Sequence, residues 1–441
     1  MVIGSDGLGR SVEREKQNAQ GGSMKRLAWH LFIVFTVVGC LIRGSFAQQA
    51  LTWREVREKF EANNPTLIAG RIGIEESRAQ EITAFLRPNP TFTASVDQLH
   101  PWKSSQAWVD TLPIASVNYL FERRHKRQLR LESAQKGTAV AISELADETR
   151  SLLFTLRSAF VQVLQQKAIL ELAKENLSFY DRVLQVSSDR FKAGDIARID
   201  LDRLQLQRVT FESDLETAEV NLRTAKIQLL MLLNERTSVE QFDVAGPFDF
   251  SEQISPLTEF RGIALDTRPD LRAAVQSIDQ AKANHRLAEA NASTDPTVGV
   301  DFGRNNGLQY YNYVGLSVSI PLRIFDRNQG ERLRTQLDIG RNERVRDAAE
   351  ALVYSDVDSA YATLNSILIL LRPYKAKYLQ QAVTVRDIVT FSYERGGASL
   401  LDFLQAQNDY RSVRRSYLTL VGSYLTAAAQ LNLAVGKEVI Q

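Results

Sequence analysis

A stripe of mostly apolar residues runs through the first half of the chain, at a spacing that alternates between four and three residues. Its positions are Leu152, Leu156, Ala159, Val163, Gln166, Leu170, Ala173, Leu177, Tyr180, Leu184, Ser187 and Phe191. No Gly or Pro lies between Gly137 and Gly194, so nothing there breaks a helix. At roughly 1.5 Å per residue, a helix over the stripe is a rod of about 60 Å, too long to fold around a compact core. A period of about 3.5 residues is typical of supercoiled helices, so the sequence predicts long packed helices.

The same pattern occurs twice in the chain. The first helix is predicted to reverse at Gly194, which suits a left-handed helix end, and a second helix follows from about Ile199 to Leu233. A second heptad stripe runs from Val357 to Ser392 and also ends at a glycine turn. One shift of 202 residues aligns Phe191 with Tyr393, Gly194 with Gly396, Ile199 with Leu401, Asp200 with Asp402, and Gln205 with Gln407. The chain is therefore a tandem duplication of a unit of about 200 residues.

Composition excludes several classes of function. Fifty-four Lys and Arg nearly cancel 52 Asp and Glu, so no bulk charge points to nucleic acid as a partner. The only cysteine is Cys40 and the four histidines are scattered, so neither a disulfide framework nor a Cys/His metal cluster is expected within one chain. The sequence contains no nucleophile–base constellation and no phosphate loop. We therefore expect neither an enzyme nor a bound cofactor.

The N-terminus is predicted to direct export. Residues 1–23 are polar, and form either a disordered extension or an untranslated stretch if translation begins at Met24. Residues 24–47 have the basic start and short apolar run of a signal peptide, and the run is too short to span a membrane. Two processing sites remain open. One is cleavage after Ala47, and the other is lipidation of Cys40, which lies in a lipobox-like context.

Each repeat also contains a predicted β-hairpin. After Pro90 and after Pro296 the hydrophobic period changes to two, and the hairpins are expected at about 91–121 and 297–322. Aromatic residues near their far ends fit a membrane-interface girdle or, alternatively, ordinary hairpin packing; they are Trp102, Trp108, Tyr310, Tyr311 and Tyr313. Four strands cannot close a barrel, and lipid tolerates no open sheet edge, so several subunits would have to contribute. Three subunits would give twelve strands.

Three further segments carry expectations. The basic run from Arg123 to Arg130 is either a solvated helix start that meets lipid head groups or a substrate-selecting ring. Pro373 lies inside the second long rod and should kink it or shift its hydrogen bonds. The stretch 235–262 between the repeats is predicted to be a collar segment, and its part from Glu235 to Phe260, with Gly246-Pro247, is predicted to be irregular.

These features together carry a family resemblance. The motifs are Arg87-Pro88-Asn89-Pro90, Thr267-Arg268-Pro269-Asp270-Leu271, the segment from Ser319 to Gly330, and the segment from Tyr393 to Asp402. The chain resembles the TolC-like outer-membrane efflux proteins over about residues 50–436, and Ser319–Gly330 looks most like the CzcC branch, which serves metal-cation efflux. One departure is Tyr119, which stands where such proteins usually have Pro.

The resemblance implies a fold that is mainly α with β. In it, a homotrimer forms a twelve-stranded outer-membrane β-barrel, with four strands per chain, continued into the periplasm by a long α-helical coiled-coil barrel. It also implies docking to a periplasmic adaptor protein and, through it, to an inner-membrane RND-type pump. The implied adaptor-docking tips are Phe191, Ala193, Gly194 and Ile199 in the first repeat, and Arg395, Gly396, Gly397 and Ser399 in the second. The glycines explain a helix reversal whether or not a partner docks there.

The resemblance places an acidic gate at Asp402, with Gln405 where some members carry a second acid and Asp200 at the matching point of the first repeat. Three carboxylates around a narrow pore would repel one another and attract cations, whereas neutral Gln405 would not. Asp402 and Asp200 have a second interpretation as acids favoured by the dipole at a helix N-terminus. For Asp200 this second interpretation is the stronger one.

The predicted organisation follows from these points. A first repeat at 48–234 and a second at 263–436 flank the collar segment, and a short tail occupies 437–441. The predicted function is a passive export duct in the outer membrane, in contact with lipid, with heavy-metal cations as the cargo that the branch implies. The alternatives are a periplasmic coiled-coil scaffold or adaptor without a pore, and a duct for multidrug or protein secretion. The sequence does not identify the cargo, the adaptor or the pump.

Overall fold

The computed structural model describes residues 50–99, 102, 108, 110–307 and 309–440. The predicted leader, Cys40, the start at Met24 and most of the first hairpin loop lie outside the described residues. The chain divides into two compact units, and one of them, Leu51–Thr237 with Val244–Gln441, contains the helices and strands named below. The other consists of Met1–Ala50 and Ser238–Asp243, of which the described part includes a turn closed by the Gln241 N–H on the Ser238 carbonyl.

The first repeat begins with two helices, α2 (Trp53–Asn63) and α3 (Pro65–Phe85). The hairpin β1 (Thr91–Asp97) and β2 (Leu112–Leu120) follows, and then come the helices α4 (Lys126–Ala193) and α5 (Arg198–Leu232). Thr52 and Glu55 form a capping box at the start of α2. The side chain of Asn64 accepts hydrogen bonds from two backbone N–H groups at the start of α3. The 68-residue α4 extends well beyond the heptad stripe on its N-terminal side.

The second repeat has the same order of elements. It contains α6 (Leu257–Thr267), α7 (Pro269–Asn291), β3 (Thr297–Asn305), β4 (Tyr311–Ser319), α8 (Gln329–Pro373), the π-helix η1 (Tyr374–Tyr378), α9 (Leu379–Glu394) and α10 (Leu400–Val435). The prediction that the chain is irregular from Glu235 to Phe260 was wrong at its end, because α6 begins at Leu257. Pro256 stands at the N-cap with its φ fixed at −67°, and Pro suits a helix start because it lacks an N–H to satisfy.

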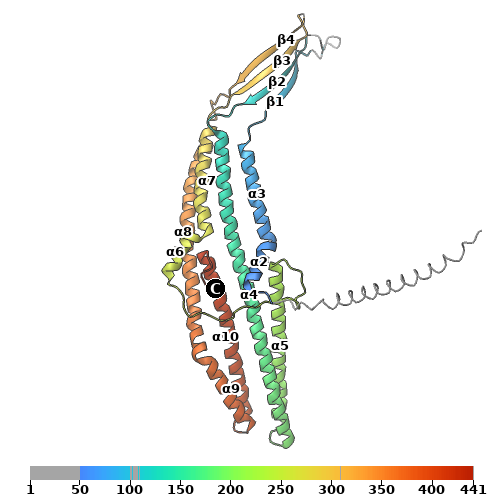
Figure 1. Cartoon of the computed structure of the whole chain (residues 1–441), viewed down its shortest axis with the longest axis vertical. Coiled ribbons are helices and arrows are strands. Elements are labelled where there is room, and N and C mark those ends of the chain that lie inside the picture. Colours follow the sequence, from blue (N-terminus) through green and yellow to red (C-terminus); the bar gives the residue numbers. More distant parts are fainter. Residues whose placement is uncertain (1–49, 100–101, 103–107, 109, 308, 441) are drawn as a thin grey trace, which may run out of the picture. The chain divides into compact units, whose positions relative to one another are not determined.

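All four strands form one antiparallel sheet in the order β1-β2-β3-β4. The inner pair, β2 with β3, joins the hairpin of the first repeat to that of the second. Figure 1 shows this sheet at one end of the long helices, with the turns that follow α4 and α9 at the other end. The helix α4 contacts α3 and α7 in one half of its length, and α5 and α10 in the other half.

In each repeat, two shorter helices meet end to end. The Asn64 side chain, just before α3, donates from Nδ2 to the Leu232 carbonyl oxygen at the end of α5 (3.1 Å). Arg268, just before α7, donates from Nη1 to the Ala434 carbonyl oxygen near the end of α10 (3.2 Å). The residue before Pro therefore makes the same kind of junction in both repeats, with a neutral side chain in the first and a charged one in the second.

Every position of the first heptad stripe is buried or partly buried, as predicted. The second stripe follows the prediction only as far as Leu371, because the π-helix begins at Tyr374, directly after Pro373. A π-helical turn holds more residues than an α-helical turn, so it rotates all later positions around the helix. Tyr378 and Val385 are consequently exposed, whereas Thr390 and Tyr393 are buried. The predicted shift of hydrogen bonding at Pro373 is confirmed. Of the stripe positions after it, Lys375, Tyr378 and Val385 are exposed, against the prediction, whereas Ala382, Val389 and Ser392 are partly buried.

Buried apolar clusters hold the helices together. One of them joins α6, α8 and α10 around Leu364, Leu368, Tyr424 and Leu431. The helix α10 is long and apolar enough, by length and composition, to cross a membrane, but 56% of its most apolar window is buried inside the protein. We therefore assign α10 to the helical core.

Two residues of the basic run after the first hairpin, Lys126 and Arg130, have internal partners, which neither predicted role of the run included. Lys126 is buried, and its ammonium lies 2.6 Å from a carboxylate oxygen of Asp295, at the base of the second hairpin. Arg130 pairs with Glu122 and donates to backbone carbonyl oxygens at the end of α3. These two cations join the strands to the helices, and they do so because each is partly desolvated and needs an internal partner.

Candidate functional site

The sheet has one apolar and one polar face. Because side chains alternate along each strand and the four strands are in register, residues of one kind form rows across the sheet. One such row consists of Phe92, Val117, Val300 and Leu316, all exposed. The neighbouring row on the opposite face consists of Thr93, Ser116, Asp301 and Gly315. An exposed apolar face opposite a polar face is the pattern of a strand segment that meets lipid on one side and water on the other.

Glycines on the polar face make room for neighbouring side chains. A Cβ at Gly299 would meet the side chains of Asn118 and Ser317, and one at Gly303 would meet the Tyr313 ring. Asp301, in the middle of this face, makes neither a hydrogen bond nor an ion pair with any described residue. The polar face therefore carries a carboxylate that no described cation neutralises.

The hairpin ends and the sheet edges are open within one chain. Trp102, Trp108 and Tyr310 expose 90%, 70% and 73% of their surface at the end of the sheet away from the helices. The outer edges of β1 and β4 pair with no other described strand. An isolated sheet with two such edges and an apolar face is a template for pairing with another copy.

At the opposite end of the long helices, the two glycine turns have the same backbone geometry. Gly194 and Gly396 have φ of 85° and 75°, a left-handed conformation that favours glycine. In the first turn the Asp195 N–H bonds to the Arg190 carbonyl (2.9 Å), and in the second the Gly397 N–H bonds to the Ser392 carbonyl (2.7 Å). Both are the six-to-one bond of a Schellman motif, so the predicted equivalence of the turns is confirmed.

The predicted tip residues all lie in or beside these two turns. Ala193, Gly194, Ile199, Arg395, Gly396, Gly397 and Ser399 are exposed, and Phe191 is partly buried. Ile199 and its counterpart Leu401 expose 57% and 75% of their surface. The Arg395 guanidinium lies 4.0 Å from the centre of the Phe391 ring. The two turns thus present apolar and cationic groups to the surroundings.

A residue that the sequence did not single out joins the two turns. Arg190, in the last turn of α4, donates from Nη1 to the Tyr393 carbonyl oxygen. Behind this contact lies an aromatic cluster in which Tyr180 stacks on Phe211 and Tyr393 stacks on Phe403. The cluster draws on both repeats, so it fixes the turns to one another.

Of the three predicted gate residues, Asp402 has the most defined geometry. It is the third residue of α10 and forms a capping box with Ser399. Its carboxylate oxygen Oδ2 accepts a hydrogen bond from the Ser399 hydroxyl, with an oxygen–oxygen distance of 2.7 Å. The Ser399 hydroxyl and backbone N–H hold the pKa of Asp402 below its usual value. The side chain is exposed, so its charge faces solvent. In the single chain, Asp402 therefore acts as a residue of the helix cap. Because its carboxylate is exposed, it is also able to face a pore in an assembly.

Gln405 and Asp200 are placed differently. Gln405 is exposed and donates to Asp409 (2.8 Å). Asp200 is the third residue of α5 and partly buried, but its helix begins after Ala197, which has no capping side chain. The matched positions Asp200 and Asp402 thus share a helix position but not a capping partner.

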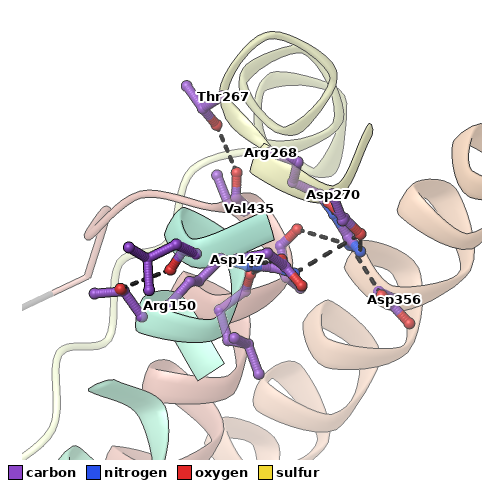
Figure 2. Close-up of polar contacts among 11 residues, drawn as sticks. Asp147, Arg150, Thr267, Arg268, Asp270, Asp356 and Val435 are labelled. Atoms are coloured by element: carbon purple, nitrogen blue, oxygen red, sulfur yellow. Dashed lines mark hydrogen bonds and ion pairs between the residues drawn. The ribbon is translucent and has the colours of Figure 1, made fainter. Parts of the chain in front are cut away.

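Sequence reasoning also missed a buried ion network at the junction of α10 with α7. Arg268, 2% exposed, binds both oxygens of Asp270 (3.0 and 2.6 Å) and one oxygen of Asp356 (2.9 Å). Figure 2 shows these residues with Arg150, which pairs with Asp147 and donates to the Leu433 carbonyl oxygen. The sequence did single out Arg268 and Asp270, since both belong to a motif that carries the family resemblance. Nothing in their spacing, however, predicted that Arg268 reaches the Ala434 carbonyl oxygen.

Among residues 50–440, excluding the gaps in the description, no group of three or more His, Cys, Asp or Glu could hold a metal ion. The described structure combines a sheet with one apolar and one polar face, long paired helices, and two exposed turns that carry charged residues.

Comparison with known proteins identifies this combination. Residues 261–437 match the family described as "Outer membrane efflux protein". The second repeat of the chain is therefore similar in sequence to outer membrane efflux proteins. The chain is 24% identical over 377 residues to the cobalt-zinc-cadmium resistance protein CzcC of Cupriavidus metallidurans. The aligned region covers 85% of this chain and 87% of the relative.

Solved channels have the same fold. The outer-membrane channel OprN matches with a TM-score of 0.72 at 15% identity, covering 87% of this chain and 89% of that one. CusC, described in terms of transmembrane channel formation, matches with a TM-score of 0.72 at 16% identity, covering 87% of this chain and 92% of the other.

The comparisons confirm the predicted resemblance and the fold class, with long helices and four strands per chain. The predicted location in the outer membrane, with an extension into the periplasm, is confirmed, and the relatives support a role in efflux.

Proposed function

We propose that this efflux protein is the outer-membrane duct of a tripartite system for heavy-metal cations, and that it works as a homotrimer. One observation carries the proposal. The four-stranded sheet is apolar on one face and polar on the other, and neither of its outer edges has a partner among the described strands. A scaffold without a pore would have no use for such a sheet, because its apolar face would be left in water.

A trimer would pair the outer edges of the sheet and place its apolar face against lipid. If β4 of one chain pairs with β1 of the next, the ring closes with twelve strands and no edge remains in lipid. Such a contact uses two different surfaces of each chain, and it closes into a ring rather than a fibre when the rotation is right. Exposed apolar residues on α3 (Ile72 and Ile82) and α8 (Leu333 and Leu337) provide further surface for the same contact along the helices.

The two repeats, 48–234 and 263–436, would each supply one hairpin and one pair of long helices to this ring. The segment 235–262 would serve as the collar between the repeats, with its last residues in α6. The duct itself is passive in this proposal. Energy comes from an inner-membrane RND-type pump, and a periplasmic adaptor connects pump and duct.

The turns would dock the adaptor and form the gate. Exposed Ile199 and Leu401 offer apolar contacts, and Arg395 offers a cation. Three copies of Asp402 near the end of the duct would repel one another and attract cations. Gln405 would add no charge, and Asp200, lacking a capping partner, is the second candidate for the acidic ring.

The choice of cargo rests on the likeness to CzcC, whose name refers to resistance to cobalt, zinc and cadmium. A duct does not need to bind its cargo, so no ligand cluster is required on its wall. A cation-attracting gate and an acid on the polar face of the sheet are compatible with cationic cargo.

Two experiments test the proposal. Outer-membrane fractions extracted in mild detergent should yield a trimer that dissociates on heating and forms channels in planar bilayers. A water-soluble monomer without conductance would contradict the duct. Deletion of the gene should lower tolerance of cobalt, zinc and cadmium salts, whereas unchanged metal tolerance combined with new sensitivity to organic drugs would assign the duct to another cargo.

A further inference from the structure

A cleft of about 470 Å³ lies where α2, α4 and the end of α10 meet. It is separate from the strands and from the two turns. Its wall is largely apolar, with Trp53, Leu153, Phe154 and Pro269 among its lining residues. The charged residues of its lining are four cations and one carboxylate, namely Arg57, Arg150, Arg157, Lys437 and Glu438.

Arg157 has an unusual position in this cleft. Its guanidinium lies 4.5 Å from the centre of the Trp53 ring and 5.8 Å from that of Phe160, and the side chain is partly buried. It makes no hydrogen bond and no ion pair with any described residue. Burial lowers the pKa of Arg157, and the charge of Glu438 acts in the opposite direction. The guanidinium nevertheless stays charged at neutral pH, so a partly desolvated cation faces the cleft without an anion bound to it.

The other charged groups of the lining do not supply that anion. Arg57 is paired with Glu61 and Glu438, and Arg150 is paired with Asp147. Glu438 accepts hydrogen bonds from the Trp53 indole N–H and from Arg57, both at 3.3 Å. The one carboxylate of the lining is thus already engaged.

Lys437 is the second uncommitted cation. It is exposed, and none of the described residues forms an ion pair with it. Arg157 and Lys437 therefore stand on an apolar wall with their charges unpaired.

We propose that this cleft binds an anionic amphiphile, a molecule with one carboxylate or phosphate monoester group on an apolar chain. The head group would lie against Arg157 and Lys437, and the chain would lie along Trp53, Leu153 and Phe154. A guanidinium whose face rests on aromatic rings still presents its N–H edge, which matches two oxygens of a carboxylate or phosphate. The apolar wall gives a reason for a chain rather than a free inorganic anion.

Trp53 provides a direct measurement. In a variant with Trp29, Trp102 and Trp108 replaced by Phe, Trp53 is the remaining tryptophan of the sequence. With this full-length protein in maltoside detergent, octanoate added below its micelle concentration should change Trp53 fluorescence in a saturable way. Neutral 1-octanol tests for apolar binding alone, inorganic phosphate for the head group alone, and octyl phosphate separates the two head groups.

Arg157→Gln should weaken octanoate binding at least about tenfold, the loss expected for a charge-assisted hydrogen bond. Arg157→Lys, which keeps the charge, should recover part of the affinity and also shows whether a loss comes from misfolding. Equal binding of octanol and octanoate, or unchanged affinity in Arg157→Gln, would overturn the proposal. Because channel conductance is measured separately, failure of this site leaves the proposed duct untouched.

Discussion

Arg190 and Tyr393 lie 203 residues apart, yet the Arg190 Nη1 donates to the Tyr393 backbone carbonyl oxygen at 2.7 Å. The Tyr393 carbonyl also accepts the Gly396 N–H within the second turn, at 3.0 Å. The guanidinium lies 5.6 Å from the centre of the Tyr393 ring. One side chain of the first repeat thus holds the glycine turn of the second repeat in place.

Replacing Arg190 with Met should loosen the two turns. A hydrogen bond from a charged donor stabilises by about 1.5–3 kcal/mol, so the joined arrangement would lose about a factor of 10 to 100 in relative population. If the turns close the duct, single-channel conductance in planar bilayers should rise. Lys192→Met is the matched control, because Lys192 lies on the exposed surface of the same helix and, among the described residues, forms an ion pair with Asp189 alone. Equal conductance in both variants would remove Arg190 from the gate.

The two roles of Asp402 can be separated by mutating its capping partner. Asp402→Ala removes both the carboxylate and the capping box, so conductance should rise and block by multivalent cations should weaken. Ser399→Ala removes the cap but keeps the charge, so cation block should persist. Block is measured by titrating a trivalent cation on the side of the turns. If Ser399→Ala abolishes block as fully as Asp402→Ala, the helix cap alone explains Asp402.

The ion network at Arg268 should be essential to stability. Arg268→Met leaves Asp356 without its cation and the Ala434 carbonyl without this donor, and it leaves Asp270 with only the longer contact to Arg150 at 3.8 Å. Removing one partner of a fully buried pair costs about 3–5 kcal/mol. Arg268 is buried but Asp270 and Asp356 are partly exposed, so the cost should be smaller, and thermal unfolding should still move to lower temperature. Arg261→Met is the control, since Arg261 also pairs with an acid, Asp358, but both side chains are more than a third exposed. A similar loss in both variants would show that burial of the network does not matter.

The same network predicts a direction of pH dependence. Burial raises the pKa of Asp270, but hydrogen bonds and charge from Arg268 outweigh it, so the pKa lies below its usual value. A lowered folded-state pKa contributes stability above the unfolded value of about 3.9 and loses it as pH falls through the folded value. Thermal stability of the wild type should therefore fall below about pH 4. In Arg268→Met this acid-induced loss should be smaller, and an unchanged profile would argue against the linkage.

Asp301 should influence ion selectivity if the polar face of the sheet lines the duct. Its carboxylate lies between small and neutral residues and has no described counter-ion. In a trimer, Asp301→Asn removes three charges from one level of the wall, so the preference for K⁺ over Cl⁻ should fall. The measurement is the reversal potential under a salt gradient. Asp266→Asn removes an exposed charge on α6 as a control, and a shift of equal size there would exclude a local effect.

Local sequence alone determined most of the elements. The heptad stripe predicted the buried face of α4, because the period of side chains along a helix is fixed by its geometry. Pro90 and Pro296 marked the change from helix to strand, and Gly194 and Gly396 marked the turns, because each residue type restricts or frees its own backbone. The repeat of 202 residues is likewise a property of the sequence.

Only the tertiary structure decided how distant side chains meet. Nothing near Arg190, Arg268 or Lys126 in the sequence indicates their partners at Tyr393, Ala434 and Asp295. Each of these cations is withdrawn from water by packing, and its partner is then the acceptor that the fold brings within reach. The register after Pro373 was also decided at this level, since a π-helical turn rotates the following helix. Periodicity constrains what one segment can be, whereas the pairing of buried charges depends on where two segments come together.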